Sequence, residues 1–159
     1  MKFINVLKLL ASIILCQLAG IIGSLATVPA IPTWYASLKK PSFSPPNWIF
    51  GPVWAGLYTL MGISLFMVWQ RRAGHPQPKT ALFFFFIQLI LNALWSVAFF
   101  GLRSPLFGLI AIVLLWIAIL LTMISFFGIS KAAVLLLLPY ILWVSFAVLL
   151  NFSLWNLNL

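Results

Sequence analysis

Five long apolar segments constrain the fold of this chain more than any other feature of its sequence. Each is long enough to cross roughly 30 Å of hydrocarbon at about 1.5 Å per residue. Only 6% of the 159 side chains are charged, whereas a soluble domain carries roughly 25%. We therefore predict an all-α membrane protein, a bundle of five transmembrane helices at about 9–27, 46–70, 80–100, 105–127 and 132–154.

The five predicted helices form a single transmembrane domain over residues 1–159, with one long connection at 28–45. Prolines at 41, 45 and 46 stiffen the end of this connection, and large aromatic side chains occur along and just after it. A flexible linker does not carry so many rings. We therefore expect a structured flap at the mouth of the bundle.

The chain has no Asp or Glu and a formal charge of +9. Its basic residues lie singly or in pairs between apolar segments, so we predict contacts with the lipid bilayer and no nucleic-acid partner. Without carboxylates, one chain cannot build a proton relay, a cation-selective ring or a carboxylate metal site. The only histidine, His75, is predicted on the side opposite the flap, so we expect no metal site and no axial ligand for a haem iron.

The distribution of basic residues predicts the orientation of the chain. Six of them fall on the N-terminal side of the predicted spans, and three fall on the other side. The positive-inside rule then places the N-terminus in the cytoplasm, and the 28–45 loop and the C-terminus on the opposite side. The first segment is expected to be a retained helix, because prolines flank its only candidate signal-peptide cleavage site.

Two pairs of small residues on the first helix, Ala19 with Gly23 and Gly20 with Ser24, would let another helix approach closely. The partner is either a helix of the same bundle or the first helix of a second copy in a homodimer. The sequence leaves both open.

Three predicted helices each carry one face of aromatic and polar residues, with the spacing i, i+4, i+7. These faces are Trp54, Tyr58, Met61, Gly62 and Leu65 on the second helix; Gln88, Asn92, Trp95, Ser96 and Phe99 on the third; and Tyr140, Trp143, Ala147, Asn151 and Trp155 on the fifth. The fourth helix is nearly uniformly apolar, and we expect it to face mostly lipid.

Indole and amide groups within hydrocarbon need hydrogen-bond partners. The three faces therefore either hold the helices together or line a shared cavity, and we favour the cavity. Such a cavity suits a flat, mostly apolar ligand with a few polar edges. Lys39 and Lys40 on the flap either meet carboxylates of this ligand or lie solvated at the lipid headgroups.

At these residues the sequence resembles the TspO/MBR family, the tryptophan-rich sensory proteins related to the mitochondrial translocator protein (peripheral-type benzodiazepine receptor). The matching motifs are WYASLKKPSFSPP, PVWAGLYTLMG, LNALWSVAFFG and LPYILWVSFAVLLN, which cover essentially the whole chain in order. The resemblance implies a bacterial-type five-helix bundle, often a homodimer, with a ligand pocket beneath the first long loop. It implies porphyrin, haem-type and drug-like isoquinoline or benzodiazepine ligands, with protoporphyrin IX or haem as a ligand and no required cofactor.

The resemblance also implies which residues bind the ligand. By motif position these are Trp34, Tyr35, Trp54, Tyr58, Asn92, Trp95, Trp143 and Ala147. Trp54 and Trp143 match the tryptophans to which light-dependent protoporphyrin degradation is attributed in some members. The final segment, LLNFSLWNLNL, lacks the Tyr and the basic residue of the sterol-recognition pattern, so sterol binding by that motif is not expected.

These features favour a membrane protein that binds tetrapyrroles for sensing, regulation or disposal. Two alternatives stay open. The first is an enzyme that degrades protoporphyrin in light without a conventional catalytic site, with Trp54 and Trp143 as the reacting residues. The second is a transporter of small apolar or anionic molecules, which the absence of inverted repeats and of a charged pathway disfavours.

Overall fold

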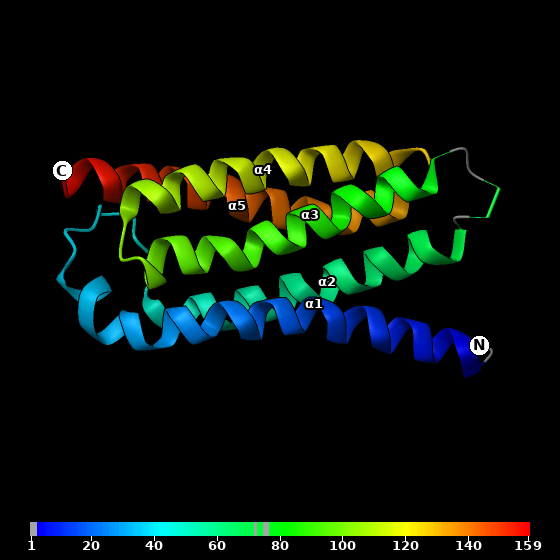
Figure 1. Ribbon diagram of the computed structural model, residues 1–159, viewed down its shortest axis with the longest axis horizontal. Coiled ribbons are helices and arrows are strands. Elements are labelled where there is room, and N and C mark those ends of the chain that lie inside the picture. The colour runs from blue at the N-terminus through cyan, green and yellow to red at the C-terminus, as the bar shows by residue number, and fades with distance from the viewer. Residues whose placement is uncertain (1–2, 72, 75–76) are drawn as a thin grey trace.

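The computed structural model describes residues 3–71, 73–74 and 77–159, and in these residues five long helices run along one axis (Figure 1). They are α1 (Phe3–Ala30), α2 (Asn47–Arg71), α3 (Pro78–Ser96), α4 (Pro105–Phe127) and α5 (Lys131–Leu157). Two π-helical turns, η1 (Ile31–Tyr35) and η2 (Val97–Gly101), extend α1 and α3. All five described helices are long and apolar enough to cross a membrane, which confirms the predicted all-α membrane bundle.

The helices form a ring around one core. α1 packs against α2 and α3, α2 packs against α5, and α4 lies between α3 and α5. The spatial order is therefore α1–α2–α5–α4–α3. The C-terminus and the 36–46 connection lie at one end of the bundle, and the start of α1 lies at the other (Figure 1). Which end faces the cytoplasm stays a prediction.

The first helix is longer at both ends than the predicted span 9–27. It begins at Phe3 and continues through Pro29, and the π-helical turn then contains Pro32 and ends at Tyr35. A proline removes one backbone hydrogen bond of an α-helix, and the chain changes to π-helical bonding at this point instead of leaving the helix. Trp34 therefore lies on a helix, and the connection predicted at 28–45 is shorter, at 36–46.

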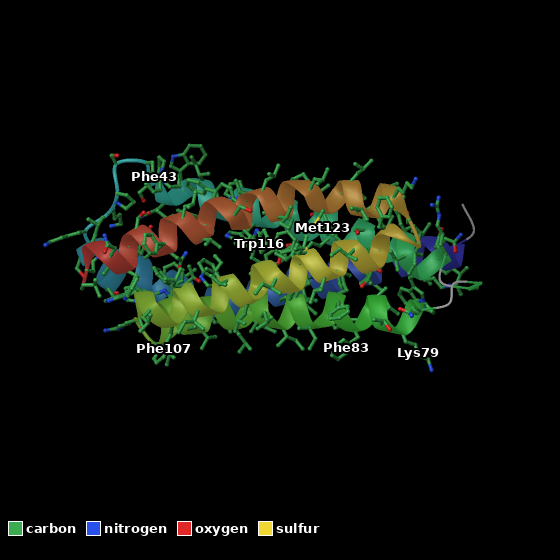
Figure 2. All side chains as sticks on the ribbon, turned by 90° about the horizontal axis from the view of Figure 1, so that it is seen from above. Phe43, Lys79, Phe83, Phe107, Trp116 and Met123 are labelled. Carbon is green, nitrogen blue, oxygen red and sulfur yellow. The ribbon has the colours of Figure 1, made fainter. Side chains whose placement is uncertain are left out.

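The fourth helix buries a larger share of its residues than the other four described helices do. In its most apolar window 39% of the residues are buried, against 22% in α1. The buried side chains include Ile112, Leu115, Ile119 and Phe126. Phe83 and Phe107 point away from the bundle, whereas Trp116 points between α4 and α5 (Figure 2), where its indole donates to the Ser145 hydroxyl at 2.8 Å. A uniformly apolar sequence carries no signal for which face is buried.

The small residues of α1 pack within the bundle. A Cβ atom on Gly23 would lie 2.9 Å from the Ser96 hydroxyl oxygen, and one on Gly20 would overlap the Tyr58 ring. The close approach that the spacing predicts is therefore made to α2 and α3 of the same chain. This is the packing alternative of the two that the sequence left open.

Candidate ligand-binding site

A cavity of about 470 Å³ lies between α1, α2, α3 and α5. Gln17 on α1 and Tyr58 on α2 are the lining residues of these two helices that lie farthest from the 36–46 connection. The cavity therefore occupies the half of the bundle next to this connection. This volume is within the range of roughly 300–1,000 Å³ that is typical of small-molecule sites. Four of the residues predicted to bind a ligand line it, namely Tyr35, Trp54, Tyr58 and Trp95.

Four aromatic rings form a continuous run along the cavity. Phe99 and Trp95 lie 6.0 Å apart with 21° between their planes, and Trp95 and Trp54 lie 6.0 Å apart with 32° between theirs. Trp54 and Tyr58 follow at 5.6 Å and 29°. Trp54 and Tyr58 are four residues apart on α2, so they share one face of that helix. The result is a continuous run of aromatic rings, each inclined by 21–32° to the next, assembled from three elements.

A chain of hydrogen bonds fixes Tyr58 from behind. The Tyr58 hydroxyl donates to the Asn92 side-chain oxygen, and the Asn92 amide donates to the Tyr140 hydroxyl at 2.9 Å. Tyr140 in turn donates to Gln88 at 2.8 Å, and the Gln88 amide lies 3.9 Å from the Met61 sulfur. All five side chains are buried. Asn92 therefore lies outside the lining of the cavity and joins α2, α3 and α5 behind it.

Trp95 has a similar support on α5. Its indole N–H donates to the Asn151 side-chain oxygen at 3.3 Å, and the Asn151 amide donates to the Ala147 carbonyl at 2.8 Å. Asn151 lines the cavity, whereas Ala147 is buried one turn away and does not. The indoles of Trp54 and Trp95 are thus held by contacts with neighbouring helices, which keeps their planes in place.

Trp34 and Trp143 are not among the residues that line the cavity. The Trp143 ring lies 6.0 Å from Phe50, which does line it, and belongs to a separate cluster between α2 and α5. Its buried indole N–H has no hydrogen-bond partner among the described residues. Trp34 packs edge-on against Phe99 at 5.3 Å. The wall therefore pairs Trp54 with Trp95, and Trp143 lies behind Phe50.

Gln17 is one of the lining residues that the sequence analysis missed, as are Asn47, Trp48 and Phe50. Its side-chain amide donates to the Ala55 carbonyl and to the Thr59 hydroxyl, each at 3.0 Å, and so ties α1 to α2. The signal was present, since Gln17 is a lone amide within the apolar run LLASIILCQLAGII. The predicted faces of the other helices are marked by their aromatic residues, whereas α1 has none between Phe3 and Trp34.

Tyr35, the last residue of η1, lines the end of the cavity next to the connection. Tyr35 packs against Phe99 at 6.2 Å and against Phe100 at 5.6 Å, and the Lys40 ammonium lies 4.6 Å from the centre of the Tyr35 ring. Lys39 and Lys40 do not line the cavity. His75, considered above as a haem ligand, lies outside the described residues.

The fold and this site define an integral, multi-pass membrane protein with an aromatic interior cavity. The chain belongs to the TspO/MBR family, whose model matches residues 12–156, as the motifs predicted. It is 48% identical to the tryptophan-rich protein TspO of Archaeoglobus fulgidus over 97% of this chain and 99% of that protein. The human translocator protein is 37% identical over 79% of this chain and 75% of its own length. The tryptophan-rich sensory protein of Cereibacter sphaeroides is 37% identical over 79% of this chain and 77% of its own length.

Proposed function

We propose that this protein binds tetrapyrroles of the porphyrin and haem type in its aromatic cavity, and that it acts in their sensing, regulation or disposal. The observation that carries the proposal is the continuous run of Phe99, Trp95, Trp54 and Tyr58 along a cavity of about 470 Å³. A conjugated macrocycle offers a flat face to such a surface, and each aromatic contact adds about 0.5–1.5 kcal/mol beyond burial. The name of the relative from Cereibacter sphaeroides, tryptophan-rich sensory protein, supports a sensory role.

The geometry suggests distinct roles for the residues. Trp54 and Trp95, neighbours in one wall, contact the same side of the macrocycle, Tyr58 closes its inner end, and Tyr35 covers its outer end. The same surface suits the smaller fused rings of isoquinoline and benzodiazepine-like ligands. Trp143 acts on the ligand only through Phe50, at a ring distance of 6.0 Å.

The charges suggest how a tetrapyrrole lies in the cavity. None of the residues that line the cavity is Lys or Arg, and a carboxylate left unpaired in apolar surroundings is strongly disfavoured. Lys40, which lies over Tyr35, is the cation next to the covered end. The carboxylates of the ligand therefore point toward the 36–46 connection, where Lys40 and water stabilise them.

The proposal is tested by titrating the purified protein in detergent with protoporphyrin IX in the dark and following tryptophan fluorescence. The wild type should show saturable quenching in the micromolar range. Trp54→Leu should weaken binding by about tenfold, because it removes one ring of the wall. Trp116→Leu is the matched control, because Trp116 lies between α4 and α5 and does not line the cavity. Quenching that does not saturate, or equal affinities for both variants, would contradict the proposal.

A light-dependent enzyme is a second candidate, favoured by the two indoles of Trp54 and Trp95 in the wall of one cavity. Indoles held against a bound photosensitiser are positioned to react with the oxygen species that it forms. Illumination of the same sample should then produce bilin-like absorbance bands that depend on Trp54 and do not appear in the dark. Equal bleaching of free protoporphyrin IX would show that the protein adds nothing to this reaction.

A further inference from the structure

The contact between α1 and α2 is closed in one half of the bundle. A Cβ atom on Gly62 would lie 2.5 Å from the Cα atom of Ile13, so the two backbones touch at this point. One turn nearer the cavity, the Gln17 amide spans the two helices by its bonds to Ala55 and Thr59. No slot for a ligand is left between α1 and α2 on this side of Gln17.

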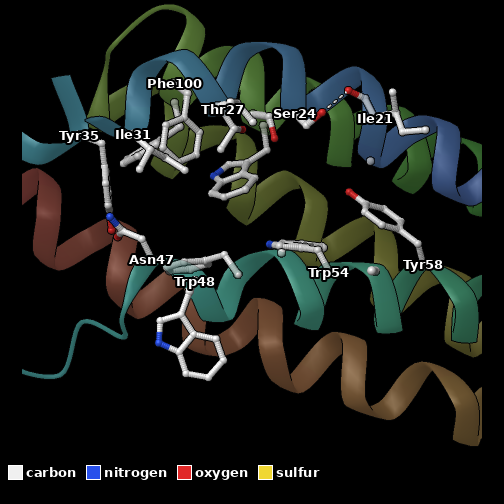
Figure 3. A pocket seen from close by; sticks show the side chains of 18 of the residues that line it. Ile21, Ser24, Thr27, Ile31, Tyr35, Asn47, Trp48, Trp54, Tyr58 and Phe100 are labelled. Carbon is white, nitrogen blue, oxygen red and sulfur yellow. Dashed lines mark hydrogen bonds between the residues drawn. The ribbon is translucent and has the colours of Figure 1, made fainter. Parts of the chain in front are cut away.

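Beyond Gln17 the same two helices leave the cavity open on one side. Ile21 and Val28 of α1 line the cavity and are nevertheless 56% and 64% exposed. Gly51 and Ala55 of α2 also line it and are also exposed. Residues that line a cavity and are exposed at the same time mark its opening. Figure 3 shows α1 and α2 on opposite sides of the cavity, with Ile21 on the one and Trp54 on the other.

This opening lies along the length of the membrane-spanning helices. Its four rim residues fall within the candidate spans Phe3–Tyr35 and Asn47–Arg71. From Ile21 to Val28 the rim extends over about 10 Å at about 1.5 Å per residue. Along the slot these rim residues are Ile, Val, Gly and Ala, whereas the other exposed lining residues, Asn47 and Trp48, lie at the start of α2 next to the connection. Such a rim is suited to contact with lipid tails.

The end of the cavity next to the connection is lined by buried Tyr35 and by the exposed Asn47 and Trp48. Tyr35 packs on Phe99 and Phe100 there. The 36–46 connection is fastened to the end of α5, because the Asn158 side chain accepts from the Lys39 N–H and donates to the Lys39 carbonyl, each at 2.9 Å. The exposed lining residues at this end are therefore a polar and an aromatic side chain beside the fastened connection, whereas those along the slot are apolar.

We propose that the ligand enters and leaves the cavity sideways, from the hydrocarbon of the bilayer, through the slot between α1 and α2. This inference rests on the proposed binding function and adds to it the class of ligand and its source. The site selects flat molecules that are already dissolved in the membrane. The polar or charged edges of such a molecule point toward the connection, because the side chains along the slot offer them no hydrogen-bond partner.

Two glycines of α2 provide a matched test of this route. A Cβ atom would meet nothing within 4 Å at Gly51 or at Gly56. Both are exposed positions of the same helix, but Gly51 lines the cavity and Gly56 does not. Gly51→Phe therefore places a ring at the mouth of the slot, whereas Gly56→Phe places the same ring on the outer surface of α2.

The measurement is stopped-flow quenching of tryptophan fluorescence in lipid vesicles, with protoporphyrin IX and its dimethyl ester as probes. With Gly51→Phe, association and dissociation of both probes should slow together by on the order of tenfold, with little change in Kd. Gly56→Phe should match the wild type. The neutral dimethyl ester should enter the wild type at least as fast as the free acid.

The contrary outcomes separate the two proposals. If Gly51→Phe and Gly56→Phe show the same kinetics while the wild type binds saturably, the side entrance is wrong and the binding function stands. If Gly51→Phe weakens binding by accelerating dissociation, the ring occupies the site and does not block a route, which also overturns the inference. If no protein binds either probe saturably, the proposed function itself fails.

A second measurement needs no ligand and no kinetics. Acyl chains that carry bromine atoms quench an indole on contact, so vesicles of brominated lipid report which tryptophans the hydrocarbon reaches. The contribution of Trp54 is the difference in fluorescence between the wild type and Trp54→Phe. Brominated lipid should quench this contribution in the wild type, and Gly51→Phe should protect Trp54 from the quenching. Trp54 fluorescence that brominated lipid leaves unchanged in the wild type would show that the slot is closed to the bilayer.

Discussion

The interface between α1 and α2 has a closed half and an open half. In the closed half, Gly62 lets the backbone of Ile13 approach directly. In the open half, the exposed rim residues Ile21 and Val28 lie across the cavity from Gly51 and Ala55. Both halves are apolar, so hydrophobicity does not separate them.

The two halves differ in how their side chains are supported. Lipid tails are as apolar as the helices, so helices associate in membranes mainly by close packing and hydrogen bonds. The closed half obtains its packing directly between α1 and α2. In the open half Trp54 packs on Trp95 of α3, and Tyr58, whose ring lies against Gly20 of α1, bonds to Asn92 of α3. Stability and ligand access are therefore assigned to different halves of one helix pair.

The largest effect is expected from a substitution in the closed half, where the backbones of α1 and α2 touch. Gly62→Ala adds a methyl group whose nearest atoms are the Cα and N of Ile13, at 2.5 and 2.8 Å, and a backbone cannot move aside as a side chain can. Overpacking of this kind costs typically about 1–3 kcal/mol. We expect a loss of about 3 kcal/mol in the free energy of unfolding, seen as a lower midpoint of thermal unfolding in detergent.

The control for this prediction is Gly56→Ala on the same helix. A Cβ atom there meets nothing within 4 Å, and Ala is favoured over Gly in a helix interior by about 1 kcal/mol. Gly56→Ala should therefore be neutral or stabilising. Equal midpoints for the two variants would mean that the closed contact does not hold α1 to α2.

The sequence predicted the fold because five apolar segments of this length have few alternatives in a membrane. It misjudged the end of α1, because a proline within a long apolar helix reads as a stop, whereas neighbouring helices cover Tyr35 and keep the chain helical. The shortened connection and the helical position of Trp34 follow from that one error. These effects are tertiary and leave no local signal.

For the cavity, helical spacing identified the right faces but not the depth of each residue. Trp54, Tyr58 and Trp95 line the cavity, whereas Asn92 and Ala147 share those faces and lie behind it. Spacing gives the direction of a side chain around its helix. The layer that the side chain occupies depends on how far apart the helices stand, and that distance is set by contacts such as Gly62 with Ile13.

Between the two halves, the position of Tyr58 depends on its hydrogen bond to Asn92. Asn92→Leu leaves the Tyr58 hydroxyl without its acceptor and the Tyr140 hydroxyl without its donor. Interhelical hydrogen bonds in membranes average about 0.6 and reach about 1.7 kcal/mol. Since two such bonds are lost, we expect destabilisation of about 1–2 kcal/mol in thermal unfolding, together with weaker quenching by protoporphyrin IX.

A double-mutant cycle separates the network from simple volume changes. Tyr58→Phe alone removes the hydroxyl that donates to Asn92. If the two groups act together, Tyr58→Phe with Asn92→Leu should cost less than the sum of the single variants. Strict additivity would mean that Asn92 supports the cavity by packing alone.

The smallest effect is expected at the 36–46 connection, next to the open half. Asn158→Ala removes both hydrogen bonds that pair this side chain with the backbone of Lys39. Because the bonds are exposed, their net contribution is about 1 kcal/mol, so the connection should open about fivefold more often. Trypsin can cut after Lys39, and cleavage there should accelerate by the same factor in Asn158→Ala.

Asn156→Ala is the matched control, since Asn156 is exposed in the same last turn of α5 and does not contact Lys39 through a hydrogen bond. It should leave the rate of cleavage unchanged. The proposed side entrance makes a further prediction for Asn158→Ala, because a looser connection does not widen the slot between α1 and α2. Entry of protoporphyrin dimethyl ester from the bilayer should therefore be unchanged in Asn158→Ala. If entry accelerates with cleavage, the connection is the gate, and the open half of the α1–α2 interface is not the route.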